Sequence, residues 1–123
     1  MAKILIVDDS PTIRRMVAAS LQSLEEVFFE EASNGLEAIE LLAREPFNLM
    51  ILDLNMPDMH GLEVLQFIRT HPQYRGLPII VLTTKYDEES RKTALERGAS
   101  RFLTKPFEPT TLRQHAASLL ERK

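Results

Sequence analysis

Residues able to do chemistry follow four short apolar segments of this sequence. Asp8 and Asp9 come directly after the first segment and Asp53 after a later one, while Thr83 and Lys105 follow two others. If the segments are parallel strands, their carboxyl ends meet at one edge of a sheet, where the ligands of such sheets bind. The sequence therefore predicts that three carboxylates, a hydroxyl and an ammonium group lie together.

Carboxylates gathered in this way repel each other. A raised pKa, a basic partner or a divalent cation relieves the repulsion. The set offers oxygen donors and none of the His or Cys that Zn²⁺ prefers, so Mg²⁺, which works beside phosphate, fits better. Lys105 and Thr83 could hold the oxygens of a phosphoryl group during in-line transfer to a carboxylate. We therefore predict a Mg²⁺ site formed by Asp8, Asp9 and Asp53, at which a carboxylate accepts a phosphoryl group.

Each of these residues also has an ordinary structural explanation. Asp is common at strand ends and helix caps, and the proline after Lys105 suits a simple turn. Ser10 already supplies a cap for the first helix, however, which leaves Asp8 and Asp9 without a structural task. Because titratable groups with shifted pKa values cluster at functional sites, the set as a whole favours a functional site, although no member does so alone.

The elements that must position these residues are predicted from hydrophobic periodicity. Short apolar segments alternate with longer ones of helical period, which is typical of an α/β fold with a parallel sheet. The predicted strands are residues 4–7, 27–32, 49–52, 79–82 and 101–104. Three of them are almost continuously apolar, as expected for central strands covered on both faces. The second carries Glu30 and Glu31, which indicates an edge strand.

Capping residues and prolines mark the helices between the strands. Ser10 is the predicted cap of the first helix and Pro11 its first residue. The other starts are predicted at Asn34-Gly35, Gly61, Asp87 and Pro109, and ends at Pro72 and Gly98. Helical spacing predicts buried faces formed by Ile13, Met16, Val17 and Leu21; by Leu36, Ile39 and Leu42; by Leu62, Leu65 and Ile68; and by Leu112, Ala116 and Leu119.

Composition excludes several classes of protein. The 123 residues, 44% hydrophobic and 27% charged, are typical of one soluble domain. A net charge of −3 gives no general attraction to nucleic acid or anionic membrane. The absence of cysteine rules out disulfides and thiolate metal sites, and the start of the chain lacks a signal-peptide pattern or membrane span. We expect a single domain over residues 1–123, located in the cytoplasm.

A wider set of residues resembles the receiver domains of bacterial two-component response regulators, of the single-domain CheY-like type. The resemblance covers the whole chain, and its motifs are highly specific as a set. They are ILIVDDS at residues 4–10, Asn34-Gly35, DLNMP at residues 53–57, Gly61, Thr83-Thr84, Gly98-Ala99 and FLTKPF at residues 102–107.

The resemblance implies a five-stranded parallel sheet of order 2-1-3-4-5 with helices on both faces, as in flavodoxin-like folds, and a cis bond before Pro106. It implies that Asp53 is the phosphoacceptor. It also implies that Asp9, Asp53 and the Asn55 carbonyl bind Mg²⁺, with Asp8 acting mainly through water.

A conformational switch is implied as well. Thr83 and Lys105 would hold the phosphoryl oxygens, and Phe102 would swing inward as Thr83 moves towards them. Phe102 is otherwise an ordinary packing aromatic. The implied donor is a phosphohistidine on a sensor histidine kinase, and the implied target is a protein that binds the last helices and strand. We expect a monomeric signalling switch that loses its phosphoryl group by itself, rather than a turnover enzyme, with no direct nucleic-acid or membrane partner.

Other functions stay open on the sequence alone. A flavodoxin-like nucleotide or flavin binder could use the same sheet, but neither G-x-G-x-x-G nor a Walker motif occurs. A hydrolase with paired carboxylates would need a substrate pocket that no pattern indicates. His60, His71 and His115 lack the spacing of a metal site, so we expect them to be solvated or to serve in packing.

Overall fold

The computed structural model of the chain describes residues 1–56, 59–84 and 87–121. Pro57, which contributes to the resemblance, lies outside these ranges. Strands and helices alternate along the chain. The strands are β1 (Ala2–Val7), β2 (Val27–Ala32), β3 (Leu49–Leu52), β4 (Ile79–Thr83) and β5 (Arg101–Thr104). The helices are α1 (Pro11–Leu21), α2 (Gly35–Arg44), α3 (Gly61–Thr70), α4 (Glu88–Glu96) and α5 (Pro109–Leu120).

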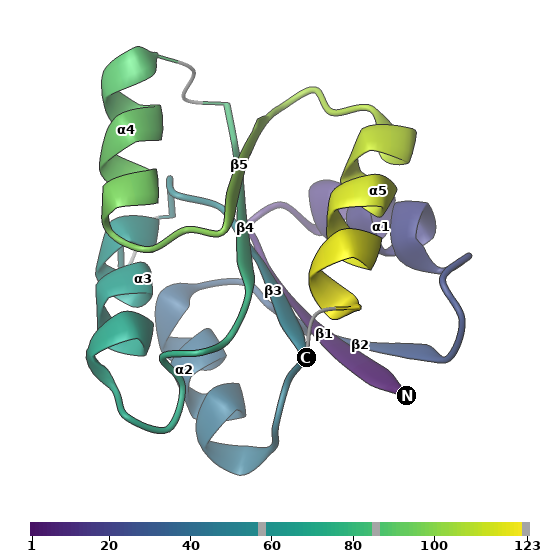
Figure 1. The fold of residues 1–123 in the computed structure, drawn as a ribbon, viewed down its shortest axis with the longest axis horizontal. Coiled ribbons are helices and arrows are strands. Elements are labelled where there is room, and N and C mark those ends of the chain that lie inside the picture. Colours follow the sequence, from purple (N-terminus) through teal and green to yellow (C-terminus); the bar gives the residue numbers. More distant parts are fainter. Residues whose placement is uncertain (57–58, 85–86, 122–123) are drawn as a thin grey trace.

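The sheet has the order β2-β1-β3-β4-β5, and every neighbouring pair is parallel. The predicted fold class and strand order are therefore confirmed. Figure 1 shows α2, α3 and α4 on one face of the sheet and α1 and α5 on the other. The three layers follow from the alternation of strands and helices, because each crossover between parallel strands needs a connection long enough to hold a helix.

Alternating side chains of each strand supply the two cores. In β1, Leu5 and Val7 pack under α2 and α3, whereas Ile4 and Ile6 pack under α1 and α5. All residues of β3 and β4 are buried, while the outer strands β2 and β5 are largely half-exposed. The edge position predicted for β2 is confirmed.

The predicted helix boundaries rest on side-chain caps. Ser10 Oγ accepts a hydrogen bond from the Ile13 backbone N–H at 3.2 Å and so caps α1. Asn34 and Asp87 cap α2 and α4 in the same way. Gly98 follows the end of α4 with φ of +110°, a conformation that side chains with a Cβ rarely adopt. The three caps thus fix where α1, α2 and α4 begin, and Gly98 ends the segment of α4 before β5.

Two of the predicted inward residues are wrong. Met16 is 48% exposed and Leu36 is 58% exposed. The buried residues are Val17, Ser20 and Leu21 in α1 and Gly35, Ala38 and Leu42 in α2. Each exposed side chain lies one residue from the buried stripe, about 100° around the helix. The prediction counted apolar residues alone, whereas the buried stripes also include the small residues Ser20 and Gly35.

Gly61 generates a prediction because α3 begins against the end of β3. A Cβ at Gly61 would lie 2.4 Å from the Asp53 carbonyl oxygen and 2.6 Å from Leu54 Cα, both backbone atoms. We expect Gly61→Ala to lower the free energy of unfolding by about 1–3 kcal/mol, the usual cost of overpacking. Gly76→Ala is the control, since nothing lies within 4 Å of its added Cβ. Urea denaturation would show equal midpoints for the two variants if the close approach were unimportant.

Candidate functional site

Backbone hydrogen bonds fix the residues at the carboxyl edge of the sheet. The Asp53 N–H donates to the Val7 carbonyl at 3.0 Å, and the Lys105 N–H donates to the Thr83 carbonyl at 2.9 Å. Asp8 is held in the same way against the end of β2. The parallel ladder therefore continues beyond the strands and sets the positions of the chemically active residues.

Three carboxylates converge at this edge, as predicted. Asp8, Asp9 and Asp53 each offer one oxygen, and these oxygens all lie within 4.8 Å of one another. Asp8 is 3% exposed and Asp53 is 5% exposed, whereas Asp9 is open to solvent. Two carboxylates of the cluster are thus buried and the third is exposed.

Lys105 reaches the same cluster from β5. Its Nζ lies 2.7 Å from Asp8 Oδ2 and 3.6 Å from Asp53 Oδ1. Its side chain is nearly buried, so water screens these charges less than at an open surface. One ammonium group balances only one of the three carboxylates, which leaves negative charge for a further cation to neutralise.

The pKa of Asp53 is raised above the ordinary value of 3.8, chiefly because burial disfavours its charged form. The Lys105 charge opposes this rise, whereas the negative charge of Asp8 adds to it. The Asn55 backbone N–H donates to the carboxylate and also lowers the pKa, and Asp9 makes a last, raising contribution. Burial and crowding by like charge therefore outweigh the lysine and the hydrogen bond.

The donor set fits a hard divalent cation. All the clustered ligand atoms are carboxylate oxygens, and the net charge around them is negative. Mg²⁺ takes one or two carboxylates and keeps several waters, which suits a site with one exposed acid. The structure thus supports a cation site at Asp8, Asp9 and Asp53.

Thr83 and Asn55 lie beside the carboxylates. Thr83 is fully buried at the end of β4, and the Asn55 side-chain amide donates to its hydroxyl at 3.4 Å. Asn55 itself is exposed in the loop after β3. The two residues link the end of β4 to this loop.

Phe102 lies deeper on the same face of the sheet as Thr83. Phe102 pairs with Val81, and Thr104 with Thr83, so the alternation of side chains places Phe102 and Thr83 on one face. Phe102 is half-buried against the core beneath α3 and α4. Thr83 and Phe102 therefore lie on the same face of neighbouring strands.

Sequence reasoning missed the role of His60. Its backbone N–H donates to Glu63 at 3.0 Å, and its Nδ1 accepts from the Leu62 N–H at 3.1 Å, which forms a capping box at the start of α3. Ser, Thr, Asp and Asn are the residues expected at such a position. The only sequence signal for this capping box was Glu63, because a Glu three residues after the cap position can accept from the backbone N–H of the cap residue.

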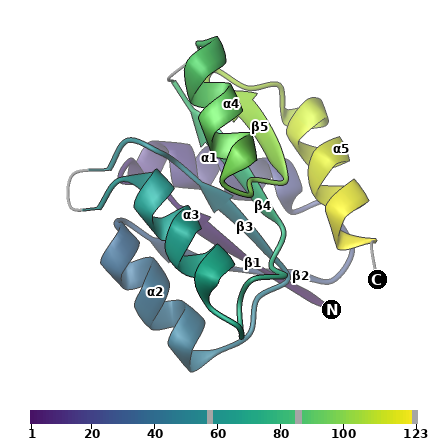
Figure 2. The same cartoon turned by 60° about the vertical axis from the view of Figure 1, so that its left-hand side comes forward.

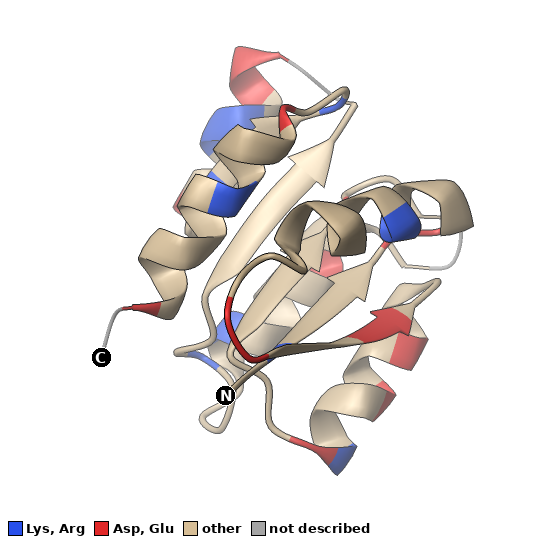
Figure 3. Cartoon of the chain, turned by 90° about the vertical axis from the view of Figure 1, so that its right-hand side faces the viewer, with Lys and Arg blue, Asp and Glu red and all other residues tan. Residues whose placement is uncertain are grey.

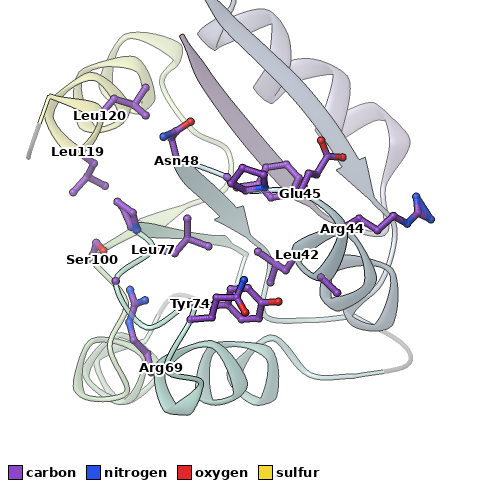
Figure 4. Close-up of a pocket in the computed structure, with 16 residues that line it drawn as sticks. Leu42, Arg44, Glu45, Asn48, Arg69, Tyr74, Leu77, Ser100, Leu119 and Leu120 are labelled. Carbon is purple, nitrogen blue, oxygen red and sulfur yellow. The ribbon is translucent and has the colours of Figure 1, made fainter.

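A groove among the described residues lies at the opposite end of the sheet. This groove of about 840 Å³ is lined by the end of α2, the loop before β4 and the end of α5. Figure 4 shows Arg69, Tyr74 and Leu119 among its walls. Its lining includes none of the clustered carboxylates, so it offers no substrate pocket for a hydrolase built on them.

Comparisons with known proteins agree with this geometry. The model of the family described as response regulator receiver domain matches residues 4–117. The chain is similar to a chemotaxis protein CheY homolog of Campylobacter jejuni, with 38% identity over 96% of this chain and 92% of that protein. It is 40% identical to the transcriptional regulatory protein SrrA of Staphylococcus aureus, over 98% of this chain and 48% of that protein.

A solved structure gives the same result. The chemotaxis response regulator CheY4 of Vibrio cholerae superimposes with a TM-score of 0.87 and 39% identity, over 97% of this chain and 98% of that one. None of these similarities favours a flavodoxin-like nucleotide or flavin binder.

The raised pKa of Asp53 predicts how stability depends on pH. A carboxyl that binds its proton more tightly when folded destabilises the fold once it is ionised, so this penalty is present at neutral pH and disappears below 3.8, where both states are protonated. We expect Asp53→Asn to raise the free energy of unfolding at pH 7, with a gain that shrinks as the pH falls towards 3.8.

Urea denaturation at several pH values, in the presence of a chelator, measures this gain. Glu40→Gln removes an exposed carboxylate of α2 and is the control, for which we expect no comparable gain. A variant at Asp53 that is no more stable than the parent at pH 7 would contradict the electrostatic account.

Proposed function

Because this chain belongs to the response regulator receiver domain family, we propose that it is a phosphorylation switch in which Asp53 accepts the phosphoryl group. The observation that carries the proposal is the position of this carboxylate. It lies buried at the end of β3, with two other carboxylates and Lys105 Nζ around it. Asp9 is exposed, and both Asp8 oxygens already accept, from Lys105 and from the Ser10 N–H, so Asp53 is the buried carboxylate that we propose as the acceptor.

The proposed reaction moves the phosphoryl group from a phosphohistidine of a sensor histidine kinase to Asp53. A carboxylate oxygen of Asp53 attacks phosphorus, the P–N bond breaks, and the imidazole nitrogen leaves with the electron pair and takes up a proton. Water later attacks the phosphorus and releases the carboxylate. The protein is a switch that hydrolyses its own acyl phosphate and does not turn over an external substrate.

Mg²⁺ is the proposed cation. Asp9, Asp53 and the Asn55 carbonyl would hold it, with Asp8 acting mainly through water. When bound, it would supply positive charge to the phosphoryl oxygens. The all-oxygen donor set and its uncompensated negative charge support this assignment.

Thr83 and Lys105 are the proposed ligands of the remaining phosphoryl oxygens. A new hydrogen bond from the buried Thr83 hydroxyl would draw that side chain towards the phosphate, and Phe102 would move inward into the space it leaves. The shared face of Thr83 and Phe102 supports this coupling. Phe102 lacks a hydroxyl group, so packing alone would distinguish its two positions.

The proposed output surface is formed by α4, β5 and α5. Figure 2 shows these elements together along one side of the molecule. The surface next to Phe102 would change shape when Asp53 is phosphorylated, and the affinity of a target protein for this surface would change with it. We propose that the target is a protein and not nucleic acid, because a net charge of −3 gives the chain no general attraction to nucleic acid.

Several expectations about the chain as a whole stay predictions. They are its organisation as a single receiver domain over residues 1–123, its monomeric state and its cytoplasmic location. Over the part of the chain that the structure describes, no helix has the length and apolar character needed to cross a membrane.

The proposal predicts a specific mass change. Incubation with Mg²⁺ and a small phosphodonor is expected to add the mass of one phosphoryl group to the intact protein, and Asp53→Asn is expected to abolish the addition. Glu40→Gln, which removes an exposed carboxylate of α2, should leave it unchanged. Intact-mass spectrometry makes the comparison, and an addition that persists in Asp53→Asn would refute Asp53 as the acceptor.

Lys105 yields a separate kinetic prediction. We expect Lys105→Ala to slow phosphorylation by about a hundredfold, because removing one preorganised group that stabilises developing charge commonly costs this much. Lys92→Ala removes the same charge from an exposed position of α4 and should keep the parent rate. Stopped reactions analysed by intact mass give both rates. Equal rates for the two variants would show that Lys105 has no part in transfer.

A further inference from the structure

Arg14 of α1 joins the backbone of the acidic cluster to the end of β2. Its Nη1 donates to the Asp8 carbonyl oxygen at 2.6 Å, and its Nε donates to Glu31 Oε1 at 2.7 Å. The Arg14 side chain is 15% exposed and its contact with the Asp8 carbonyl is partly buried, whereas the Glu31 side chain is 44% exposed. Figure 3 shows the basic segment of α1 above the acidic end of β2. The planar guanidinium group serves two acceptors in a fixed geometry.

The carbonyl that Arg14 holds belongs to the peptide between Asp8 and Asp9. The Asp8 side chain is already fixed, because Oδ1 accepts from the Ser10 N–H at 2.9 Å and Oδ2 contacts Lys105. The Asp9 carboxylate has no hydrogen bond or ion pair within the described ranges, so only its backbone orients it. Arg14 therefore controls the peptide plane from which the exposed acid of the cluster projects.

We propose that Arg14 is a positioning residue for the cation site, acting through the Asp8–Asp9 peptide; this inference rests on the proposed function. Glu31 holds the guanidinium group in place and neutralises its charge. Arg14 touches neither the cation nor the phosphoryl group. Residues outside the ligand set that orient metal ligands commonly change metal affinity by 10- to 100-fold when they are removed.

Charge and position predict opposite effects for the loss of Arg14. If the arginine acted only as a nearby positive charge, its removal would strengthen cation binding, because like charges repel. If it fixes the Asp8–Asp9 peptide, its removal weakens binding despite the more negative site. A purely structural clamp between α1 and β2 would lower stability and leave cation affinity unchanged. The Mg²⁺ dissociation constant therefore separates the three roles: it falls if Arg14 acts by charge, rises if Arg14 fixes the peptide, and stays unchanged for a structural clamp.

The test is a Mg²⁺ titration of the full ¹⁵N-labelled chain, followed through the amide signals of Asp9 and Asp53. We expect Arg14→Ala to raise the Mg²⁺ dissociation constant about tenfold or more. Arg15→Ala removes the same charge from the next, exposed residue of α1 and should leave the constant unchanged or slightly lower. The Asp9 amide signal of the metal-free protein should shift in Arg14→Ala and not in Arg15→Ala.

Arg14→Lys is a third variant, which keeps the positive charge. One ammonium group cannot match the geometry of both acceptors, the Asp8 carbonyl and the Glu31 carboxylate. We expect the dissociation constant of Arg14→Lys to lie between those of the parent and Arg14→Ala. Equal Mg²⁺ dissociation constants for Arg14→Ala and Arg15→Ala would overturn the inference. If Arg14→Ala does not fold, an Arg14→Lys variant with the dissociation constant of the parent would overturn it instead. A parent chain that binds no Mg²⁺ would instead overturn the metal site of the proposed function.

Discussion

Repulsion among three carboxylates at one edge of the sheet is the constraint on which this structure depends. Asp8, Asp9 and Asp53 lie within reach of a single ion, and two of them are buried. Burial normally excludes charge unless it is paired. Lys105 provides part of the compensation, and the raised pKa of Asp53 shows that the compensation is incomplete. The residual negative charge favours a cation, and the burial of Asp53 is the main source of the cost to stability.

The scaffold keeps these groups together through backbone contacts rather than through the charges themselves. The Asp53 and Lys105 amides extend the strand ladder, and Arg14 holds the Asp8 backbone carbonyl. Such contacts do not depend on the protonation state of the carboxylates. A site held in this way can gain or lose charge without losing its shape, as the proposed phosphorylation of Asp53 requires.

The sequence was most informative where local rules decide the structure. Strand ends, helix caps and the edge position of β2 were predictable, because apolar segments and residues such as Ser10 and Asp87 act over a few positions. The convergence of Asp8 and Asp53 followed from parallel topology alone. Met16 and Leu36 were misplaced because periodicity finds an apolar stripe but not which of its residues the sheet allows to approach. Arg14 and Arg15 are adjacent and identical in type, so only the tertiary fold distinguishes the one that contacts Asp8.

The ion pair between Lys105 and Asp8 joins residues separated by 97 positions in the chain. The first strand supplies the acid, the last strand supplies the base, and Asp53 stands between them. During synthesis the acidic residues emerge first, and they acquire their cationic partner only when the final strand has paired with β4. The complete carboxylate and lysine cluster therefore depends on completion of the sheet, and a chain interrupted before Lys105 contains the proposed acceptor Asp53 without its ammonium partner.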